Sequence, residues 1–170
     1  FAPLNIGYRE YRNIHAGHHR DTATEQDPDA FHILGGHLKA LFGTISLHEQ
    51  QLIRYIRRHG LSGELALMTG IRLGLFIALL LIAPMAFLWW WLALRLTYMV
   101  NDYVFFHLVH YRAKSYGSFP IPLPALIRYP AILIYGFDVL YATMHHDIHH
   151  EHQMVAARHL PKIAAQRARP

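Results

Sequence analysis

The sequence contains no cysteine among its 170 residues. This absence excludes disulfide bonds, thiolate zinc sites and cysteine nucleophiles, and it leaves the redox compartment undetermined. Charged residues are scarce at 16% of the chain, whereas hydrophobic residues make up 53%. From Leu65 to Val100 there is no acidic residue, and the only basic ones are Arg72 and Arg95. Such a run exceeds the ~20 residues that cross a bilayer once, so we expect it to be embedded in a membrane.

A proline interrupts this apolar run. Pro84 divides residues 65–104 into two limbs, each near the length of one membrane span. The sequence therefore predicts a transmembrane hairpin over 65–104, with a tight turn at the proline. Arg72 and Arg95 lie at similar distances from that turn, so both side chains would extend toward the same membrane surface. One long tilted helix with a proline kink is the alternative.

Basic residues gather outside the apolar run and give the chain a net charge of +5. Arg54, Arg57 and Arg58 precede the run, and Arg112 and Lys114 follow it. Basic clusters beside membrane spans are typical of the cytoplasmic side and of contact with anionic headgroups, and they could also bind an acidic protein partner. No nucleic-acid-binding motif is present, so we expect no nucleic-acid partner.

Histidine, in contrast, is abundant, with 15 residues in the chain. Two clusters share the spacing H-x-x-H-H: His15, His18 and His19, and then His146, His149 and His150. On a helix, positions i, i+3 and i+4 lie on one face, so each cluster can direct three imidazoles toward one point. Crowded protonated imidazoles would repel one another, whereas neutral imidazoles bind metal ions. The clusters therefore predict metal ligands.

If both clusters bind one centre, they must lie on the same side of the membrane. This requires an even number of crossings between them, which favours the hairpin over the single kinked helix. His107 and His110 directly follow the second limb and would emerge on the same side, so either could complete the coordination sphere. Asn101 could contribute through a water molecule.

The remaining segments predict helices that lie at the membrane surface. Residues 7–20 are expected to form the helix that carries the first cluster, and Pro28 prevents its continuation. Amphipathic helices are predicted over 31–60, either at the membrane interface or packed on the protein itself. Residues 118–124 are too rich in proline for a helix, and 131–143 predict a short interfacial helix that leads into the second cluster. Four scattered histidines are expected to be interfacial polar residues: His32, His37, His48 and His59.

Taken together, these patterns resemble the membrane fatty acid desaturase superfamily. Its members carry three histidine boxes, with a membrane hairpin between the second and the third. Residues 15–19 match the second box, and Arg20 through Asp29 resemble the sequence that continues it in many bacterial members. Residues 146–150 match the third box, and Leu160-Pro161 falls where those proteins often have the same pair. The resemblance covers most of the chain.

The resemblance implies an all-α integral membrane protein with a transmembrane hairpin, amphipathic interfacial helices and a cytosolic histidine-box cap. It implies two non-haem iron ions, with dioxygen as co-substrate, and a reaction that introduces a C=C bond into a fatty acyl chain. The family's additional histidine would correspond to His110, which is therefore preferred over His107. The implied ligand set is His15, His18, His19, His110, His146, His149 and His150. The implied electron donor is an external protein of the ferredoxin, rubredoxin or cytochrome b5 type.

The first histidine box of the family is not found in this chain. We therefore expect residues 1–170 to form one partial desaturase-like domain that lacks its amino-terminal part and is inactive alone. The position four before His110 is Phe106 rather than the family's asparagine, and Gln153 and Ala156 stand where prolines usually follow the third box. These departures concern the subfamily rather than the boxes.

Other functions remain open. A hydroxylase or ketolase acting on an alkane, sterol or carotenoid would use the same boxes. A metal-binding or transport protein is a weaker alternative, because an ion pathway needs polar or acidic groups within the spans and none lies between Glu64 and Asp102. A haem protein would place single histidines at facing depths within helices rather than triplets.

Overall fold

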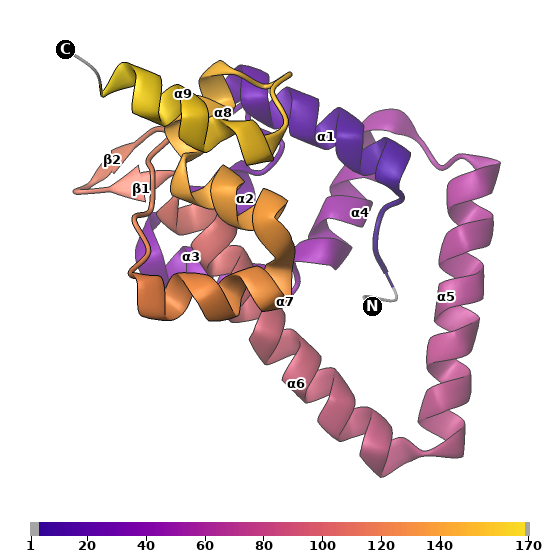
Figure 1. Cartoon of the computed structure of the whole chain (residues 1–170). Coiled ribbons are helices and arrows are strands. Elements are labelled where there is room, and N and C mark those ends of the chain that lie inside the picture. Colours follow the sequence, from indigo (N-terminus) through magenta and orange to yellow (C-terminus); the bar gives the residue numbers. More distant parts are fainter. Residues whose placement is uncertain (1–3, 169–170) are drawn as a thin grey trace. The chain divides into compact units, whose positions relative to one another are not determined.

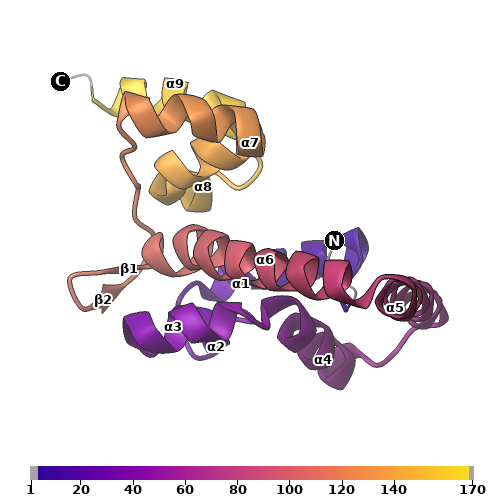
Figure 2. The ribbon, with the colours of Figure 1, turned by 90° about the horizontal axis from the view of Figure 1, so that it is seen from below.

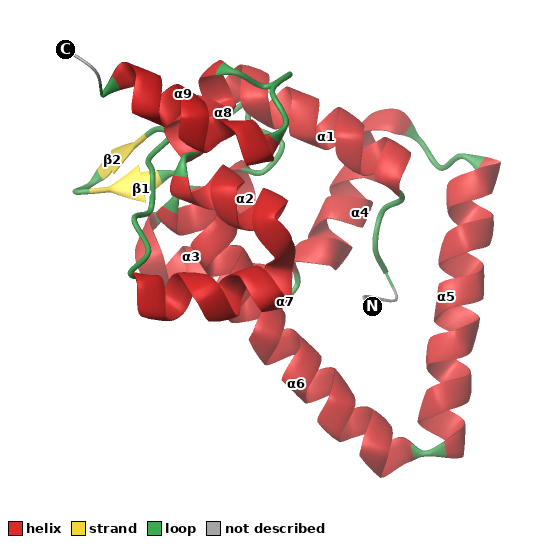
Figure 3. Ribbon diagram, viewed as in Figure 1, coloured by secondary structure: helices red, strands yellow, loops and turns green. Residues whose placement is uncertain are grey.

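A computed structural model describes residues 4–168 and divides the chain into two compact units, Phe1–Tyr103 and Val104–Pro170. Both units are helical, as predicted (Figure 1). A single pair of short antiparallel strands among the described residues, β1 (Tyr111–Arg112) and β2 (Ser115–Tyr116), departs from the all-α prediction (Figure 3). These strands join Tyr111 to Tyr116 across a turn in which Ala113 and Lys114 have left-handed backbone conformations.

The first unit begins with the helix that carries the first histidine cluster, α1 (Tyr8–Asp21). Residues 31–60, predicted as amphipathic helices, form three helices: α2 (Ala30–Ile33), α3 (Gly36–Thr44) and α4 (Leu47–His59). Positive φ angles at Gly35 and Gly36 separate α2 from α3. The core of this unit joins Ile6 and Ile14 of the N-terminal part to Leu52 of α4 and Leu65.

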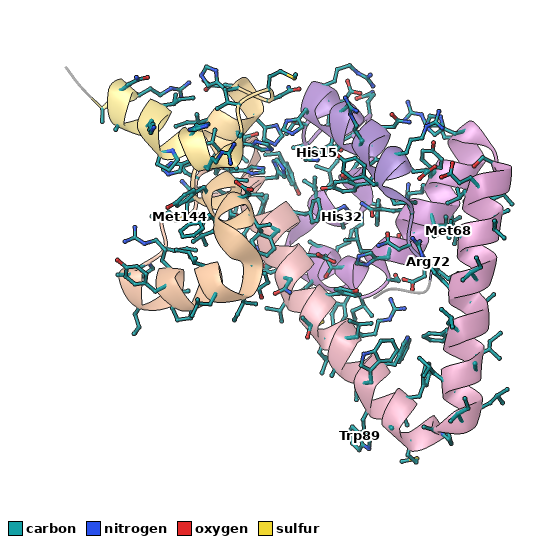
Figure 4. The ribbon with its side chains drawn as sticks, turned by 45° about the vertical axis from the view of Figure 1, so that its right-hand side comes forward. His15, His32, Met68, Arg72, Trp89 and Met144 are labelled. Atoms are coloured by element: carbon teal, nitrogen blue, oxygen red, sulfur yellow. The ribbon has the colours of Figure 1, made fainter. Side chains whose placement is uncertain are left out.

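The predicted hairpin is present as two helices, α5 (Gly63–Ile82) and α6 (Pro84–Asp102). Ala83 between them has non-helical geometry (φ −143°, ψ 67°), and Pro84 occupies the first turn of α6, where its missing N–H costs nothing. The two helices meet at this turn and diverge from it (Figure 1), and the rings of Phe76 and Phe87 lie 4.5 Å apart near the vertex. Trp89 also lies near the turn, whereas Met68 and Arg72 lie toward the start of α5 (Figure 4). The chain therefore reverses at the proline instead of continuing as one kinked helix.

The two arginines of the hairpin make specific contacts within the unit. Arg95 donates to the Ile45 carbonyl (2.9 Å) and to both carboxylate oxygens of Glu49, and it lies over the Trp91 ring. Arg72 donates to the carbonyl of Asn5 (2.7 Å). The expectation that both side chains simply extend to the membrane surface was incomplete, because each has a fixed acceptor in the protein. Nearby, α3 lies alongside α6 (Figure 2), and the Thr44 hydroxyl donates to the Met99 carbonyl (3.1 Å).

Two helices of the described chain are long and apolar enough to cross a membrane: α5 and α7 (Ala125–Met144), each of 20 residues. Most large apolar side chains of α5 are exposed, as suits a helix that faces lipid. The second limb, α6, does not meet the same criterion, because three tryptophans, Arg95 and its polar end lower its mean hydropathy. The segment expected to be too short for a span, 131–143, instead belongs to the longer α7.

The boundary between the units falls after the first residue of a π-helix, η1 (Tyr103–Leu108). The strand pair follows in the second unit, and residues 118–124 form the predicted loop. The helix α7 is broken at Gly136, whose φ of 81° is left-handed, and it contains Pro130. Three elements complete the unit: α8 (His146–Glu151), the 3-10 helix η2 (Ala157–His159) and α9 (Leu160–Arg167). Contacts of α7 with α8, η2 and α9 form the compact part of this unit (Figure 2).

Candidate metal centre

Three histidines of the second unit bring their Nε2 atoms together. The Nε2 of His146 lies 3.0 Å from that of His110 and 3.1 Å from that of His150. The three ring centroids are 4.6 to 5.0 Å apart. All three ligand atoms lie within 4.8 Å of one another, so this group could hold a metal ion. His110 and His146 are buried, whereas His150 is half-buried.

The other ring nitrogens of this group determine its protonation state. The Nδ1 of His110 is bonded to the Gly117 carbonyl (2.7 Å), and that of His146 to the Ala142 carbonyl (3.2 Å). Because a carbonyl oxygen can only accept, both Nδ1 atoms carry the proton, and in the neutral rings both Nε2 atoms are bare acceptors. Two bare acceptors at 3.0 Å repel each other unless a cation lies between them. The donor set therefore fits a metal ion bound by neutral imidazoles.

Local structure explains why His110 belongs to this group. The β1–β2 hairpin returns the chain so that Gly117 N donates to the His110 carbonyl (3.0 Å), which places the Gly117 carbonyl beside the His110 ring. Phe119 N also donates to the Val109 carbonyl (2.7 Å), so two backbone hydrogen bonds hold residues 117–119 against residues 109–110. His107 is also buried, and its ring stacks on that of Tyr111 with the ring centroids 5.0 Å apart.

The helix α8 supplies the other two ligands of the group. It begins at His146, after a break in helical geometry at His145, and His150 lies one turn further along the same face. His149 lies on the same helix with its ring 5.9 Å from that of His146. Burial lowers the pKa of His145, so this neighbouring imidazole favours its neutral form.

In the first unit, α1 carries the first histidine cluster, as predicted. The Nε2 atoms of His15 and His19 lie 3.0 Å apart, and the ring of Tyr11 stacks on that of His15 at 5.5 Å. These two imidazoles, one helical turn apart, form a second pair of converging nitrogen ligands. His15 lies on α1 as Figure 4 shows.

His18 is oriented by a carboxylate that sequence reasoning did not assign. Its Nδ1 is bonded to both oxygens of Asp27 at 2.9 and 3.0 Å, and both side chains are buried. Backbone N–H groups of Ala23 (2.7 Å) and Asp29 (2.8 Å) donate to the same carboxylate. Since Asp27 accepts from Nδ1, Nε2 is the nitrogen of His18 that is directed to a metal. The only sequence signal for Asp27 was its place in the turn-rich segment after the box.

A second buried carboxylate extends this network. Asp29 accepts from the amide of Gln51 (3.0 Å), and one of its oxygens lies 3.3 Å from His32 Nε2. Burial alone would raise the pKa of Asp29, but His32, His18 and Gln51 together lower it to about 2. The carboxylates of Asp27 and Asp29 and the ring of His18 also lie close enough for their ligand atoms to hold a metal ion.

The scattered histidines differ in their surroundings. His32 was expected to be an interfacial polar residue and is instead fully buried, because the turn at 22–29 folds Asp29 against it. His59 is exposed, and His37 is exposed and hydrogen-bonded to the Tyr103 hydroxyl (2.7 Å). His48 is half-buried with its ring 4.3 Å from that of Tyr98. Asn101, the predicted water-mediated ligand, lies in the last turn of α6.

The predicted ligands thus form compact groups within each unit, with the first histidine cluster in Phe1–Tyr103 and the second cluster and His110 in Val104–Pro170. No protein-family model, curated protein or solved structure matches this chain.

Proposed function

We propose that this protein is a membrane-bound, non-haem diiron, O2-dependent lipid desaturase that introduces a C=C bond into a fatty acyl chain. The observation that carries the proposal is the convergence of three Nε2 atoms from His110, His146 and His150, with two of the Nδ1 protons held by backbone carbonyls. Neutral rings whose Nε2 atoms both lack a proton cannot hydrogen-bond to each other through those atoms. The same atoms can bind a metal ion.

Iron and the reaction class come from the resemblance of the two histidine boxes to those of the desaturases. Breaking an unactivated C–H bond requires a metal with dioxygen, since no side chain supplies an oxidant of that strength. Imidazole also suits zinc, copper and nickel, so the identity of the metal needs direct measurement. Around the metal, the residues of this chain supply orientation: Gly117 and Ala142 fix the rings of His110 and His146, and Asp27 fixes that of His18.

In this proposal both boxes contribute ligands to one diiron centre on the cytoplasmic side, with His15, His18, His19 and His149 joining the group around His146. The hairpin of α5 and α6 crosses the membrane twice and returns the chain to that side. The helix α7 lies at the interface, because its break at Gly136 leaves two arms that are each well below the ~20 residues of a span. The arginines of α4 lie at the same surface and favour the cytoplasmic side.

Metal analysis of the intact protein, purified from membranes, tests this proposal. We expect bound iron close to two ions per chain, which falls by at least half in His146→Ala and His110→Ala because each substitution removes a central ligand. Matched controls are His152→Ala and His159→Ala, two exposed histidines outside the groups. Equal iron in all four variants, or zinc in place of iron in the wild type, would overturn the diiron assignment.

Lipid profiling of cells that express the intact protein identifies the product class. A desaturase yields acyl chains that have lost two hydrogens, whereas the alternative hydroxylase or ketolase yields oxygenated alkanes, sterols or carotenoids. We expect unsaturated acyl chains that disappear with His146→Ala and with removal of the electron donor. Oxygenated products with the same dependence would replace the desaturase by the alternative, and transport of metal without any lipid product would contradict both.

A further inference from the structure

A polar cleft of about 550 Å³ lies in the first unit, and Asp27 is the residue that it shares with the network around His18. Its walls come from α1, from the turn that follows it, and from α4. Apolar contacts between Ile14 of α1 and Leu52 of α4 hold two of these walls together. Gly17 allows the turn that contains Pro28 to pack against α1, since a Cβ at this position would lie only 3.0 Å from the Pro28 ring. The cleft is thus a feature of a packed region and not of a loose surface loop.

Arginine dominates the lining of the cleft. Arg54, Arg57 and Arg58 all line it, and within residues 4–168 none of the three forms an ion pair with a carboxylate. Arg20 also lines the cleft, but its charge is paired with Asp21. The carboxylate of Asp27, another lining residue, is occupied by His18. Glu25 is the remaining acidic residue of the lining, so the cleft carries a clear excess of positive charge.

The chemistry of these side chains selects the kind of anion. Guanidinium groups present paired N–H donors that match the oxygens of phosphate. Three such positive charges suit a doubly charged phosphate better than a singly charged carboxylate. The amides of Asn13 and Gln26 also line the cleft and could donate to further oxygens, whereas the amide of Gln51, another lining residue, donates to Asp29.

The position of the cleft indicates where the anion comes from. Arg57 and Arg58 lie in the last turn of α4, which ends at His59, and the apolar helix α5 begins at Gly63. So short a connection keeps these arginines at the surface of the membrane that α5 enters. We propose that the cleft binds a phosphate group, supplied by the headgroup of a membrane phospholipid. This site does not depend on the metal or on the proposed reaction.

Binding of short-chain lipids to the protein in a phosphate-free maltoside detergent tests the site. The probes are dihexanoyl phosphatidic acid, inorganic phosphate and, as the probe without phosphate, dihexanoyl glycerol, all measured by calorimetry at constant salt. We expect saturable binding of phosphatidic acid and none of dihexanoyl glycerol. The double variant Arg57→Gln/Arg58→Gln should weaken binding about tenfold or more, because it removes two charged donors.

The matched control is Arg9→Gln/Arg12→Gln, which removes the same charge from exposed positions of α1 outside the cleft. Its affinity should stay within about twofold of the wild type. Binding of phosphatidic acid alone supports a lipid headgroup, whereas binding of inorganic phosphate with the same response to the variants assigns the site to free phosphate. Equal weakening in both double variants, or binding that does not saturate, would show diffuse attraction to charge and overturn the proposal.

Discussion

At the scale of single residues, hydrogen-bond acceptors beside the histidines decide which ring nitrogen of each could bind a metal ion. An imidazole has two nitrogens, and the acceptor that holds one of them selects the other for coordination. Gly117, Ala142 and Asp27 act in this way on His110, His146 and His18. Asp27 is the only carboxylate among these three acceptors, and two of its oxygens face the same ring nitrogen.

The substitution Asp27→Asn tests this role. It keeps the size of the side chain but removes the charge, and the amide can present an N–H toward His18 Nδ1. We expect metal affinity to fall by about 10- to 100-fold, measured by competition with a chelator. Asp21→Asn is the control, because Asp21 pairs with exposed Arg20 and touches no ligand. Unchanged affinity in Asp27→Asn would mean that His18 needs no carboxylate.

His48 makes stability depend on pH. Burial lowers the pKa of His48 from 6.5 to about 4, so protonation favours the unfolded chain. The folding stability that neutral His48 contributes is fully present above its pKa in the unfolded chain, 6.5. This stability is lost as the pH falls from 6.5 toward the folded-state pKa of about 4. We expect the protein to be on the order of 2 kcal/mol less stable at pH 5 than at pH 7 from this group. Thermal unfolding in micelles should show that loss reduced in His48→Phe, and an equal loss in both proteins would contradict it.

At the scale of elements, an ion pair between Glu49 and Arg95 connects α4 to α6. Arg95 is 8% exposed, and its guanidinium is bonded to Glu49 and the Ile45 carbonyl. A charge this far from water needs its partner, because an unpaired buried guanidinium is costly. The pair therefore fixes where α4 meets α6.

Removal of the acidic partner measures the strength of this tie. Glu49→Gln should destabilise the first unit by about 3 kcal/mol, since Arg95 keeps its charge but loses its counter-ion. Unfolding in mixed micelles, followed by tryptophan fluorescence, gives the difference. Glu64→Gln, an exposed residue in the first turn of α5, should change stability far less. Similar effects of the two substitutions would mean that the pair is not a significant support of the hairpin.

At the scale of the whole molecule, the number of membrane crossings decides whether both histidine boxes can serve one centre. Crossings by α5 and α6 alone would leave the two histidine clusters on one side, whereas a third crossing by α7 would separate them. The break at Gly136 argues against that third crossing.

The absence of cysteine makes this topology directly measurable, because any single introduced thiol is unique. In membrane vesicles, an impermeant maleimide should label Ser62→Cys, Ser118→Cys and Met154→Cys from one side and Ala83→Cys from the other. Met154 suits the test because its side chain is 98% exposed. Labelling of Met154→Cys and Ser118→Cys from opposite sides would make α7 a span and would exclude a centre that both boxes share.

The sequence by itself determined the helices, the turn at Pro84 and the residues of the histidine boxes. These follow from local rules, since proline ends a helix and the spacing i, i+3, i+4 fixes a helical face. The preference for His110 over His107 came from a resemblance and not from a local rule, because both histidines follow the same helix.

Only the tertiary structure decided which side chains contact the predicted histidine ligands. Asp27 lies nine residues from His18 and reaches it through a turn, and His110 lies 36 residues from His146 and reaches it through a hairpin. Likewise His32 is buried by Asp29, and Arg95 finds Glu49 across 46 residues. Periodicity describes one helix at a time, whereas these contacts depend on how loops return the chain, and no local rule specifies that path.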